Sequence, residues 1–358
     1  MTSRRVAAVP GAAPSIPWPS TGQAAVAVPS AGLLETSGSE SPVPIASLTK
    51  MMTAYLTLEQ HPLSATSQGP NIELTATDQQ DYEEDTVSDA SSVYVRTGET
   101  LTERQLLTAM IVRSANNLAD TFGRYDAGSI PAFVSEMNTE AQKLGMTSTH
   151  YVDTIGLDAG SVSTARDQLV LAENALALPS FESIVDNASV TLPYVGTLPN
   201  YVTDVGSDGV IGVKSGFTDA AGPCVVLAAM RQVGTQQVLV IAADLGQPDS
   251  LDYAQQEDLQ MINAVAAGLE PVTVASADEV VGELSVKAGD DAGKTTKVFT
   301  RDAVVAVGWP GSTVTVYMRK DPPDRSVKAD SEVGTLEVSS GGGPPQTVPI
   351  LAMKSIKS

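Results

Sequence analysis

Three short motifs contain the residues of this chain that could carry out nucleophilic chemistry. They are Ser47-Leu48-Thr49-Lys50, Ser114-Ala115-Asn116 and Lys214-Ser215-Gly216, and the patterns S-x-x-K, S-x-N and K-[ST]-G each occur once. A serine hydroxyl becomes a strong nucleophile only when a neighbouring base takes its proton. The motifs therefore predict a serine nucleophile with a base close by.

Lysine is the best candidate for that base because histidine is scarce. The chain has two histidines, His61 and His150, and no G-x-S-x-G nucleophile elbow accompanies either, so we expect surface or packing roles for both. Lys50 lies one helical turn after Ser47, and burial or a second cation such as Lys214 would lower its pKa. A neutral Lys50 could then accept the proton of the Ser47 hydroxyl.

The surroundings of Ser47 also suit a developing oxyanion. A serine at a helix N-terminus has a free backbone N–H and lies at the positive end of the helix dipole. A second N–H could come from Phe217. Gly216 would let an acyl chain approach the strand backbone closely, and an edge strand can pair with an extended peptide.

Each motif alone also has an ordinary structural explanation. S-x-x-K is common at exposed helix starts, an N-cap role would explain Ser114, and Lys-Ser-Gly is typical of a turn. The order of the three motifs, each in its expected helix, loop or strand, favours the catalytic interpretation.

Hydrophobic periodicity predicts the elements that carry the first two motifs. It indicates a hairpin over residues 22–37, a buried helix from Leu48 to Glu59, and a helix that Thr102 caps and that ends near Arg113. Residues 64–92 are polar and acidic. We expect them to form an exposed segment with one short strand at 72–75.

The third motif falls in a different pattern. Residues 209–246 predict an antiparallel meander with Lys214-Ser215-Gly216 on its first strand, and a helix follows at about 250–267. Short strands rich in valine and threonine follow residue 270 and predict a small all-β module. We therefore predict a disordered lead-in over 1–20, a catalytic domain over 21–269 and a β-rich accessory domain over 270–358.

The composition limits the architecture and the partners. The chain has 358 residues, 42% of them apolar, and a formal net charge of −21. This length predicts two domains, and the negative charge argues against nucleic acid as a partner. The single cysteine, Cys224, excludes an internal disulfide and a cysteine zinc site, and its apolar neighbours predict that it is buried. We expect no metal and no cofactor.

Targeting signals are not apparent in the sequence. No stretch approaches 18 uninterrupted apolar residues, so we expect no transmembrane segment. Residues 1–20 are rich in proline and alanine and lack the apolar region of a signal peptide. If the natural protein is exported, the export signal or anchor is expected to be missing from this sequence.

The motifs and their flanks resemble those of the serine-type D-alanyl-D-alanine carboxypeptidases, which are low-molecular-mass penicillin-binding proteins, in an actinobacterial style. The resemblance covers about residues 22–268 and includes Pro44–Ala54, Gly156–Asp158 and Gly212–Thr218. The strands after residue 270 are more weakly similar to the family's accessory β-domain. The resemblance implies an α/β (α+β) transpeptidase/β-lactamase-like domain, with an antiparallel sheet and a helical cluster, plus a small C-terminal all-β domain.

The resemblance also implies a reaction. Ser47 would attack the carbonyl between the terminal D-alanines of a peptidoglycan stem pentapeptide, and Lys50 would be the general base. Ser114 would relay the proton to the leaving amine, while Asn116 would hold the substrate amide and orient Lys50. Water would then cleave the acyl-enzyme, whereas β-lactams would acylate Ser47 and remain as covalent inhibitors. The place of action would be extracytoplasmic, at the cell envelope.

The implied substrate-binding residues are those of the third motif and its flank: Lys214, Ser215, Gly216, Phe217 and Thr218. Lys214 and Ser215 would bind the terminal carboxylate, with Thr218 as a helper, and the backbone amides of Ser47 and Phe217 would form the oxyanion hole. The chain departs from the family in having Ser215 where threonine is common. It also lacks a carboxylate-binding arginine in 244–248.

Two other functions remain open at this point. A class A-like β-lactamase would need a deacylating glutamate in E-x-x-L-N, and the nearest match, residues 173–177, lacks the final asparagine. A non-catalytic wall-binding protein could retain the fold, although intact Ser47, Lys50, Asn116 and Lys214 argue against it.

Overall fold

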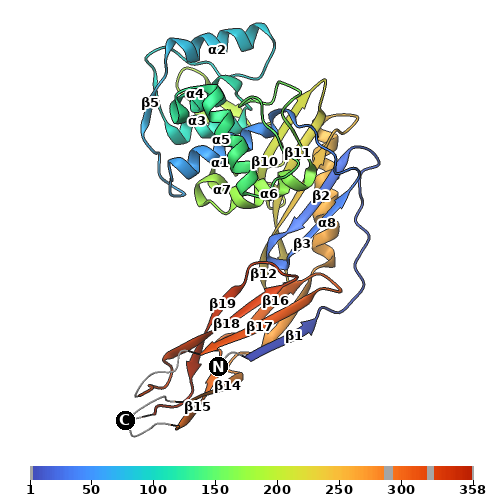
Figure 1. Ribbon diagram of the computed structural model, residues 1–358, viewed down its shortest axis with the longest axis vertical. Coiled ribbons are helices and arrows are strands. Elements are labelled where there is room, and N and C mark those ends of the chain that lie inside the picture. The colour runs from blue at the N-terminus through green and yellow to red at the C-terminus, as the bar shows by residue number, and fades with distance from the viewer. Residues whose placement is uncertain (1–2, 286–292, 321–325, 357–358) are drawn as a thin grey trace.

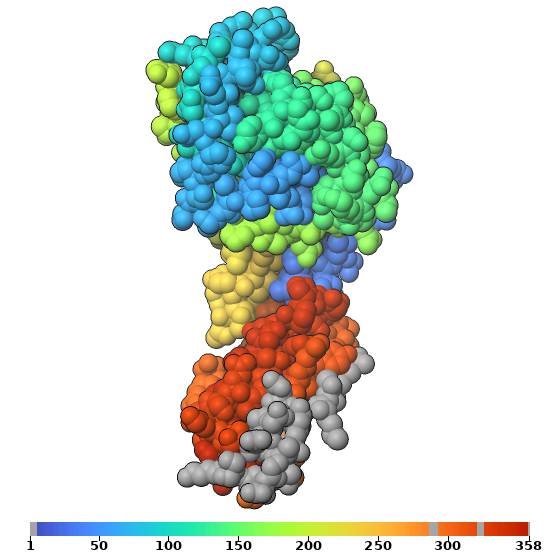
Figure 2. All heavy atoms as spheres, turned by 60° about the vertical axis from the view of Figure 1, so that its left-hand side comes forward, coloured from blue at the N-terminus to red at the C-terminus, as the bar shows by residue number. Residues whose placement is uncertain are grey.

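The computed structural model describes residues 3–285, 293–320 and 326–356. The molecule is elongated, with helices gathered around one end of a central sheet and a C-terminal β-domain at the opposite end (Figure 1). The surface narrows between these two parts (Figure 2). The predicted combination of an α/β catalytic domain and a small β-domain is confirmed.

The central antiparallel sheet has the strand order β10-β11-β12-β2-β3. Its strands, in chain order, are β2 (Gln23–Val28), β3 (Leu33–Ser37), β10 (Val210–Thr218), β11 (Gly222–Val233) and β12 (Gln236–Leu245). The hairpin and the meander predicted from the sequence are both present. Strand β10, which carries the third motif, lies at the edge of the sheet, where its outer side is open to another chain.

Each face of this sheet packs against helices. Side chains alternate along β11, so Val225 and Leu227 join the apolar core beneath α8 (Leu251–Gly268), while Cys224 and Val226 join the helical core on the other face. Cys224 is buried and unpaired, as predicted. Helix α6 (Ala165–Leu176) contacts β12 and β2.

A cluster of helices surrounds α1 (Thr49–Gln60), in which every residue from Thr49 to Leu58 is buried. A helix that is enclosed on all sides has no exposed polar face, and this explains why apolar residues and threonines make up all of residues 49–58 except Lys50. The neighbouring helices are α3 (Glu103–Val112), α4 (Asn116–Ala127), α5 (Ile130–Lys143) and α7 (Pro179–Val185). Short pairings connect them: β4 (Val43–Pro44) with β7 (Val162–Ser163), β5 (Asn71–Glu73) with β6 (Thr100–Thr102), and β8 (Ser189–Leu192) with β9 (Gly196–Pro199).

The prediction for residues 64–92 was wrong in its main part, because this segment contains the helix α2 (Ala76–Val87). Thr75 and Asp78 form a reciprocal capping box at its start. Arg124 of α4 then pairs with Asp78 at 2.7 Å and with Asp81 at 2.5 Å. The helix is thus held by charged contacts with α4, which a search for apolar periodicity does not detect.

The C-terminal domain contains a six-stranded antiparallel sheet with the order β1-β17-β18-β19-β15-β14 and a separate β13-β16 pair. The strands are β1 (Ser3–Ala8), β13 (Glu270–Ala275), β14 (Val280–Ser285), β15 (Thr295–Phe299), β16 (Val304–Gly308), β17 (Thr313–Lys320), β18 (Glu332–Ser340) and β19 (Gln346–Ala352). The predicted disordered lead-in is therefore wrong for residues 3–8. These residues pair with β17, because an open sheet edge can order a short segment through backbone hydrogen bonds.

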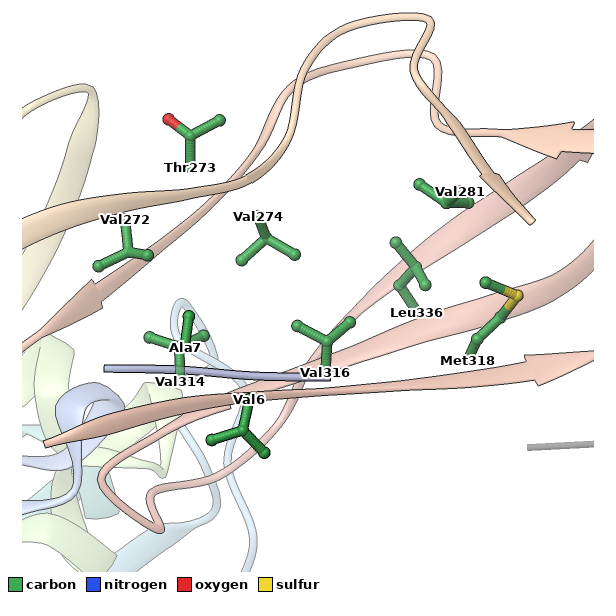
Figure 3. Close-up of a pocket in the computed structure, with 10 residues that line it drawn as sticks. All are labelled: Val6, Ala7, Val272, Thr273, Val274, Val281, Val314, Val316, Met318 and Leu336. Atoms are coloured by element: carbon green, nitrogen blue, oxygen red, sulfur yellow. The ribbon is translucent and has the colours of Figure 1, made fainter. Parts of the chain in front are cut away.

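A cavity of about 190 Å³ lies inside the C-terminal domain, between β1, β13, β14, β17 and β18. Apolar side chains line it almost entirely, and Ala7 of β1 lies opposite Val314 of β17 (Figure 3). Its lining contains no titratable side chain.

One further property concerns membranes. Within residues 3–285, 293–320 and 326–356, no helix combines the length and the apolar character that crossing a bilayer requires.

Candidate active site

Ser47 lies at the entrance to the central helix. It occupies a 3-10 turn, η2 (Ala46–Leu48), that runs directly into α1. Ala46 has φ +46°, in the left-handed region that alanine rarely adopts. Gly156 packs against this turn so closely that a Cβ there would lie 1.8 Å from the Ala46 carbonyl oxygen. Glycine at 156 thus allows the loop to touch the backbone beside the nucleophile.

Lys50 lies on the first turn of α1 and is buried, and its Nζ has three oxygen neighbours. Nζ lies 3.0 Å from Ser47 Oγ, 2.7 Å from Asn116 Oδ1 and 2.9 Å from the carbonyl oxygen of Ile155. The last two oxygens can only accept hydrogen bonds. A neutral amine has two N–H groups and one lone pair, so these acceptors use both N–H groups. The lone pair is then directed at the Ser47 hydroxyl, as a general base requires.

The electrostatic surroundings favour this neutral form. Burial lowers the pKa of Lys50 to about 7, while the nearby carboxylates Asp153, Asp120 and Asp85 act in the opposite direction. Burial, rather than the charge of Lys214 that the sequence also suggests, is the dominant cause. Near neutral pH, a large share of Lys50 is therefore unprotonated.

The second motif leads into helix α4, and the side chain of its Asn116 contacts Lys50. Ser114 has φ +55° and Asn116 is the first residue of the helix. The Asn116 N–H donates to the carbonyl oxygen of Ser91, and the side chain of Asn117 exchanges two hydrogen bonds with the backbone of Val93. These bonds hold the segment that follows α2 against the start of α4.

The third motif approaches Ser47 along the edge strand β10. A Cβ on Gly216 would lie 2.6 Å from the backbone nitrogen of Ser47, so only glycine permits this contact. Lys214 is buried, and its Nζ donates to the carbonyl oxygen of Ser215. Burial, followed by the charge of Lys50, holds the pKa of Lys214 well below its usual range.

A groove of about 480 Å³ brings these motifs together. It is lined by seven of the nine predicted site residues: Ser47, Ser114, Asn116, Ser215, Gly216, Phe217 and Thr218. Lys50 and Lys214 lie beneath it and are not among the described residues that line it. Neither His61, which pairs with Asp126 at 3.2 Å, nor His150 lines this groove.

Several residues of the site could not be identified from the sequence. Leu157, Tyr201 and Leu251 add an apolar part to the groove wall, and Asp89 and Asp219 add exposed carboxylates. The Ile155 carbonyl oxygen was also missed, because a backbone acceptor has no sequence signature. The one indication of this acceptor in the sequence was the adjacent glycine, Gly156.

Comparison with known proteins agrees with this geometry. Residues 20–247 match the family described as D-alanyl-D-alanine carboxypeptidase, peptidase family S11. The chain belongs to this family, and its fold is similar to that of penicillin binding protein 5 from Haemophilus influenzae, with a TM-score of 0.64 at 19% identity, covering 97% of this chain and 100% of that structure.

The sequence identity to individual relatives is low. The chain is 28% identical over 213 residues to the D-alanyl-D-alanine endopeptidase of Escherichia coli, covering 56% of this chain and 63% of that protein. It is 34% identical over 154 residues to the D-alanyl-D-alanine carboxypeptidase DacB2 of Mycobacterium tuberculosis, covering 41% of this chain and 53% of that protein. These matches span less than two thirds of each relative.

The fold extends over nearly the whole chain. A peptidoglycan synthesis regulatory factor (PBP3) from Streptococcus pneumoniae superimposes with a TM-score of 0.76 at 20% identity, covering 96% of this chain and 100% of that structure. The similarity therefore includes the C-terminal β-domain as well as the catalytic domain.

Proposed function

We propose that this protein is a serine-type D-alanyl-D-alanine carboxypeptidase that removes the terminal D-alanine from peptidoglycan stem peptides. The observation that carries this proposal is the environment of Lys50 Nζ. Two acceptors, Asn116 Oδ1 and the Ile155 carbonyl oxygen, occupy its N–H groups and leave its lone pair for Ser47 Oγ at 3.0 Å.

In the acylation step, Lys50 Nζ takes the Ser47 proton while Oγ bonds to the carbonyl carbon of the penultimate D-alanine. The backbone N–H groups of Ser47 and Phe217 stabilise the resulting oxyanion. Lys50 then returns its proton through the Ser114 hydroxyl to the leaving nitrogen. The C–N bond breaks, D-alanine departs, and an ester on Ser47 remains.

In the deacylation step, water attacks the ester carbonyl and gives one proton to Lys50. The C–Oγ bond breaks, Oγ recovers a proton, and the shortened peptide leaves as a carboxylic acid. Lys50 thus acts as a base and then as an acid in each half-reaction, which requires a pKa near the operating pH.

The terminal carboxylate of the substrate would contact the hydroxyl groups of Ser215 and Thr218, which line the groove. Lys214 supports it from beneath, because a bound anion raises the pKa of a nearby lysine and stabilises its charged form. The preceding part of the peptide would extend past Phe217 and pair with the open side of β10. Since stem peptides belong to the cell wall, we propose an extracytoplasmic place of action.

The first test is mass spectrometry of the intact protein after incubation with benzylpenicillin. We expect one adduct of the penicillin mass on the wild-type chain and none on Ser47→Ala. Rapid loss of the adduct would instead support the β-lactamase alternative, and absence of an adduct would support a non-catalytic wall-binding protein.

The second test distinguishes two reactions of the same acyl-enzyme chemistry. Some relatives are carboxypeptidases and others are endopeptidases by name, and the two activities differ in the amine that leaves. We expect release of D-alanine from a stem pentapeptide. Cleavage of a cross-linked peptide dimer without release of D-alanine would contradict the carboxypeptidase assignment.

A further inference from the structure

The loop that follows α5 brings a backbone carbonyl to the catalytic lysine. Residues 152–161 form neither helix nor strand, yet the Ile155 carbonyl oxygen lies 2.9 Å from Lys50 Nζ. A carbonyl group outside regular secondary structure has no helix turn or sheet ladder to fix its direction, so other contacts must do so. Here they come from the carboxylate of Asp153, a residue that lies in none of the three motifs.

Asp153 organises this loop through both of its carboxylate oxygens. Its Oδ1 accepts from the Gly156 N–H at 2.8 Å and from the Ser161 hydroxyl at 2.7 Å, and its Oδ2 accepts from the Asp158 N–H at 2.9 Å. Three donors thus converge on one half-buried side chain. Hydrogen bonds to an ionised carboxylate are stronger than those between neutral groups, so this residue contributes much of the order of the loop.

The bond to Gly156 matters most, because its N–H belongs to the same peptide unit as the Ile155 carbonyl. The atoms of a peptide unit lie in one plane, and in the trans form adopted here the N–H and the C=O point in opposite directions. A carboxylate that fixes the N–H on one side therefore fixes the direction of the carbonyl on the other. The contacts run from Asp153 Oδ1 through this peptide unit to Lys50 Nζ.

We propose that Asp153 is a positioning residue that holds the Ile155–Gly156 peptide unit with its carbonyl toward Lys50. The lysine lone pair is then left for the Ser47 hydroxyl. If the unit were turned over, the Gly156 N–H would face Nζ and compete for that lone pair, and glycine permits such a turn because positive and negative φ are both accessible to it. This inference rests on the proposed function, since it assigns Asp153 a part in the same acylation step.

Other contacts hold the two ends of the loop. The Thr53 hydroxyl of α1 donates to the Thr154 carbonyl oxygen at 2.9 Å, and the Ile45 N–H donates to the Ser161 carbonyl oxygen at 3.2 Å. These bonds tie the loop to the catalytic helix and to the segment that precedes it. Between the ends, the Asp153 carboxylate holds the backbone. Loss of this carboxylate should therefore free the middle of the loop while its ends stay attached.

Asp153 also belongs to the charges that face the base. It raises the pKa of Lys50, as do Asp120 of α4 and Asp85 of α2, against the larger effect of burial, and of these three carboxylates it acts most strongly. Lys214 of β10 interacts electrostatically with Lys50 as well. Replacing Asp153 by a neutral residue must therefore let Lys50 lose its proton at lower pH.

Three substitutions separate the hydrogen bonds from the charge. Asp153→Asn keeps one oxygen at the same distance from the backbone but loses the charge, Asp153→Glu keeps the charge but moves the carboxylate outward by a methylene group, and Asp153→Ala removes both. The measurement is the second-order rate constant for acylation by a fluorescent penicillin from about pH 5 to 9, together with the final labelled fraction. Asp158→Asn and Asp158→Ala are the matched controls, because Asp158 is an exposed carboxylate of the same loop that accepts from the Gly160 N–H at 2.8 Å.

We expect Asp153→Ala to lose about 10- to 100-fold in the high-pH plateau of the rate constant, as a mispositioned catalytic group does, while the final labelled fraction is retained. Asp153→Asn should stay within about fivefold of the wild-type plateau, and its acid limb should move to lower pH because the charge is gone. Asp153→Glu should lose more of the plateau than Asp153→Asn and keep a midpoint near that of the wild type. A purely structural defect would lower the labelled fraction and the melting temperature rather than the rate constant. The Asp158 variants should follow the wild-type profile.

A wild-type plateau in Asp153→Ala would overturn the inference. So would an equal or faster plateau in Asp153→Glu than in Asp153→Asn, which would leave a role for the charge alone. If Asp153→Ala does not fold, the order of the other two variants decides. If the wild-type chain itself is not acylated on Ser47, the proposed function fails, and that result is distinct from any difference between variants.

Discussion

Lys50 should determine how acylation of Ser47 depends on pH. Burial lowers the pKa of Lys50 from 10.5 to about 7, a shift that corresponds to roughly 5 kcal/mol in favour of the neutral amine. Only the neutral amine can accept the serine proton. The neutral fraction is then about one tenth at pH 6, half at pH 7 and nine tenths at pH 8.

The second-order rate constant for acylation by a chromogenic cephalosporin, measured by stopped flow from about pH 5 to 10, should follow this fraction. We expect about a tenfold rise between pH 5 and 6 and less than a 1.3-fold rise between pH 8 and 9. Lys50→Arg, which keeps the charge but cannot lose its proton at these pH values, should abolish acylation. Its thermal unfolding, followed by circular dichroism, controls for misfolding.

An ordinary lysine would give a different profile. With a pKa of 10.5, the neutral fraction would still rise about tenfold for each pH unit between pH 7 and 9. A rate constant that climbs in this way without a plateau would refute the assignment of a neutral Lys50 as the base. A profile that is flat from pH 5 upward would refute it as well.

Three further substitutions test contacts around the site. Gly216→Ala places a Cβ 2.6 Å from the Ser47 nitrogen, so we expect acylation to slow about 100-fold with folding retained in a thermal melt; wild-type kinetics would contradict the close approach. Arg124→Ala leaves Asp78 and Asp81 of α2 without their arginine partner, so we expect the free energy of unfolding in urea to fall by about 3 kcal/mol. A loss below about 1 kcal/mol would show that these ion pairs are dispensable. Burial raises the pKa of Asp244 to about 8 and also holds the pKa of Asp258 well above its usual range. The folded state therefore holds more protons than the unfolded state between about pH 4 and 8, and stability falls as pH rises. Asp258→Asn should therefore be more stable than wild type by about 1 kcal/mol or more at pH 8 to 9, and an unchanged dependence of unfolding on pH would exclude this buried pair as its cause.

The elements that carry the motifs could be predicted from the sequence because their signals are local. Thr102 and Gln105 form the expected capping box at the start of α3. The mostly apolar pattern of residues 48–59 identified the central helix, and two apolar runs separated by a turn at Gly234 identified the meander in 209–246. In each of these cases a few neighbouring residues determine the structure.

The two wrong predictions, for residues 3–8 and 64–92, have a different cause. Strand β1 exists because β17 offers an open edge, and α2 is held by Arg124, which lies far from it in the chain. Neither partner can be recognised from the segment itself. The same reasoning explains why Asp85 and the Ile155 carbonyl oxygen were not identified as neighbours of Lys50, since tertiary packing alone brings them together.

The site also shows why a buried lysine is accompanied by several carboxylates. Burial alone would make Lys50 a weak base, because an amine that loses its proton too easily also accepts the serine proton poorly. Asp153, Asp120 and Asp85 oppose burial and bring the pKa back to about 7. At that value the amine is free to take the proton from Ser47 and, once charged, stable enough to pass it on through Ser114. The nearby acidic residues therefore keep the pKa of Lys50 high enough for the amine to accept a proton and low enough for it to release one. The excess of acidic residues in this chain is thus compatible with lysine-dependent catalysis.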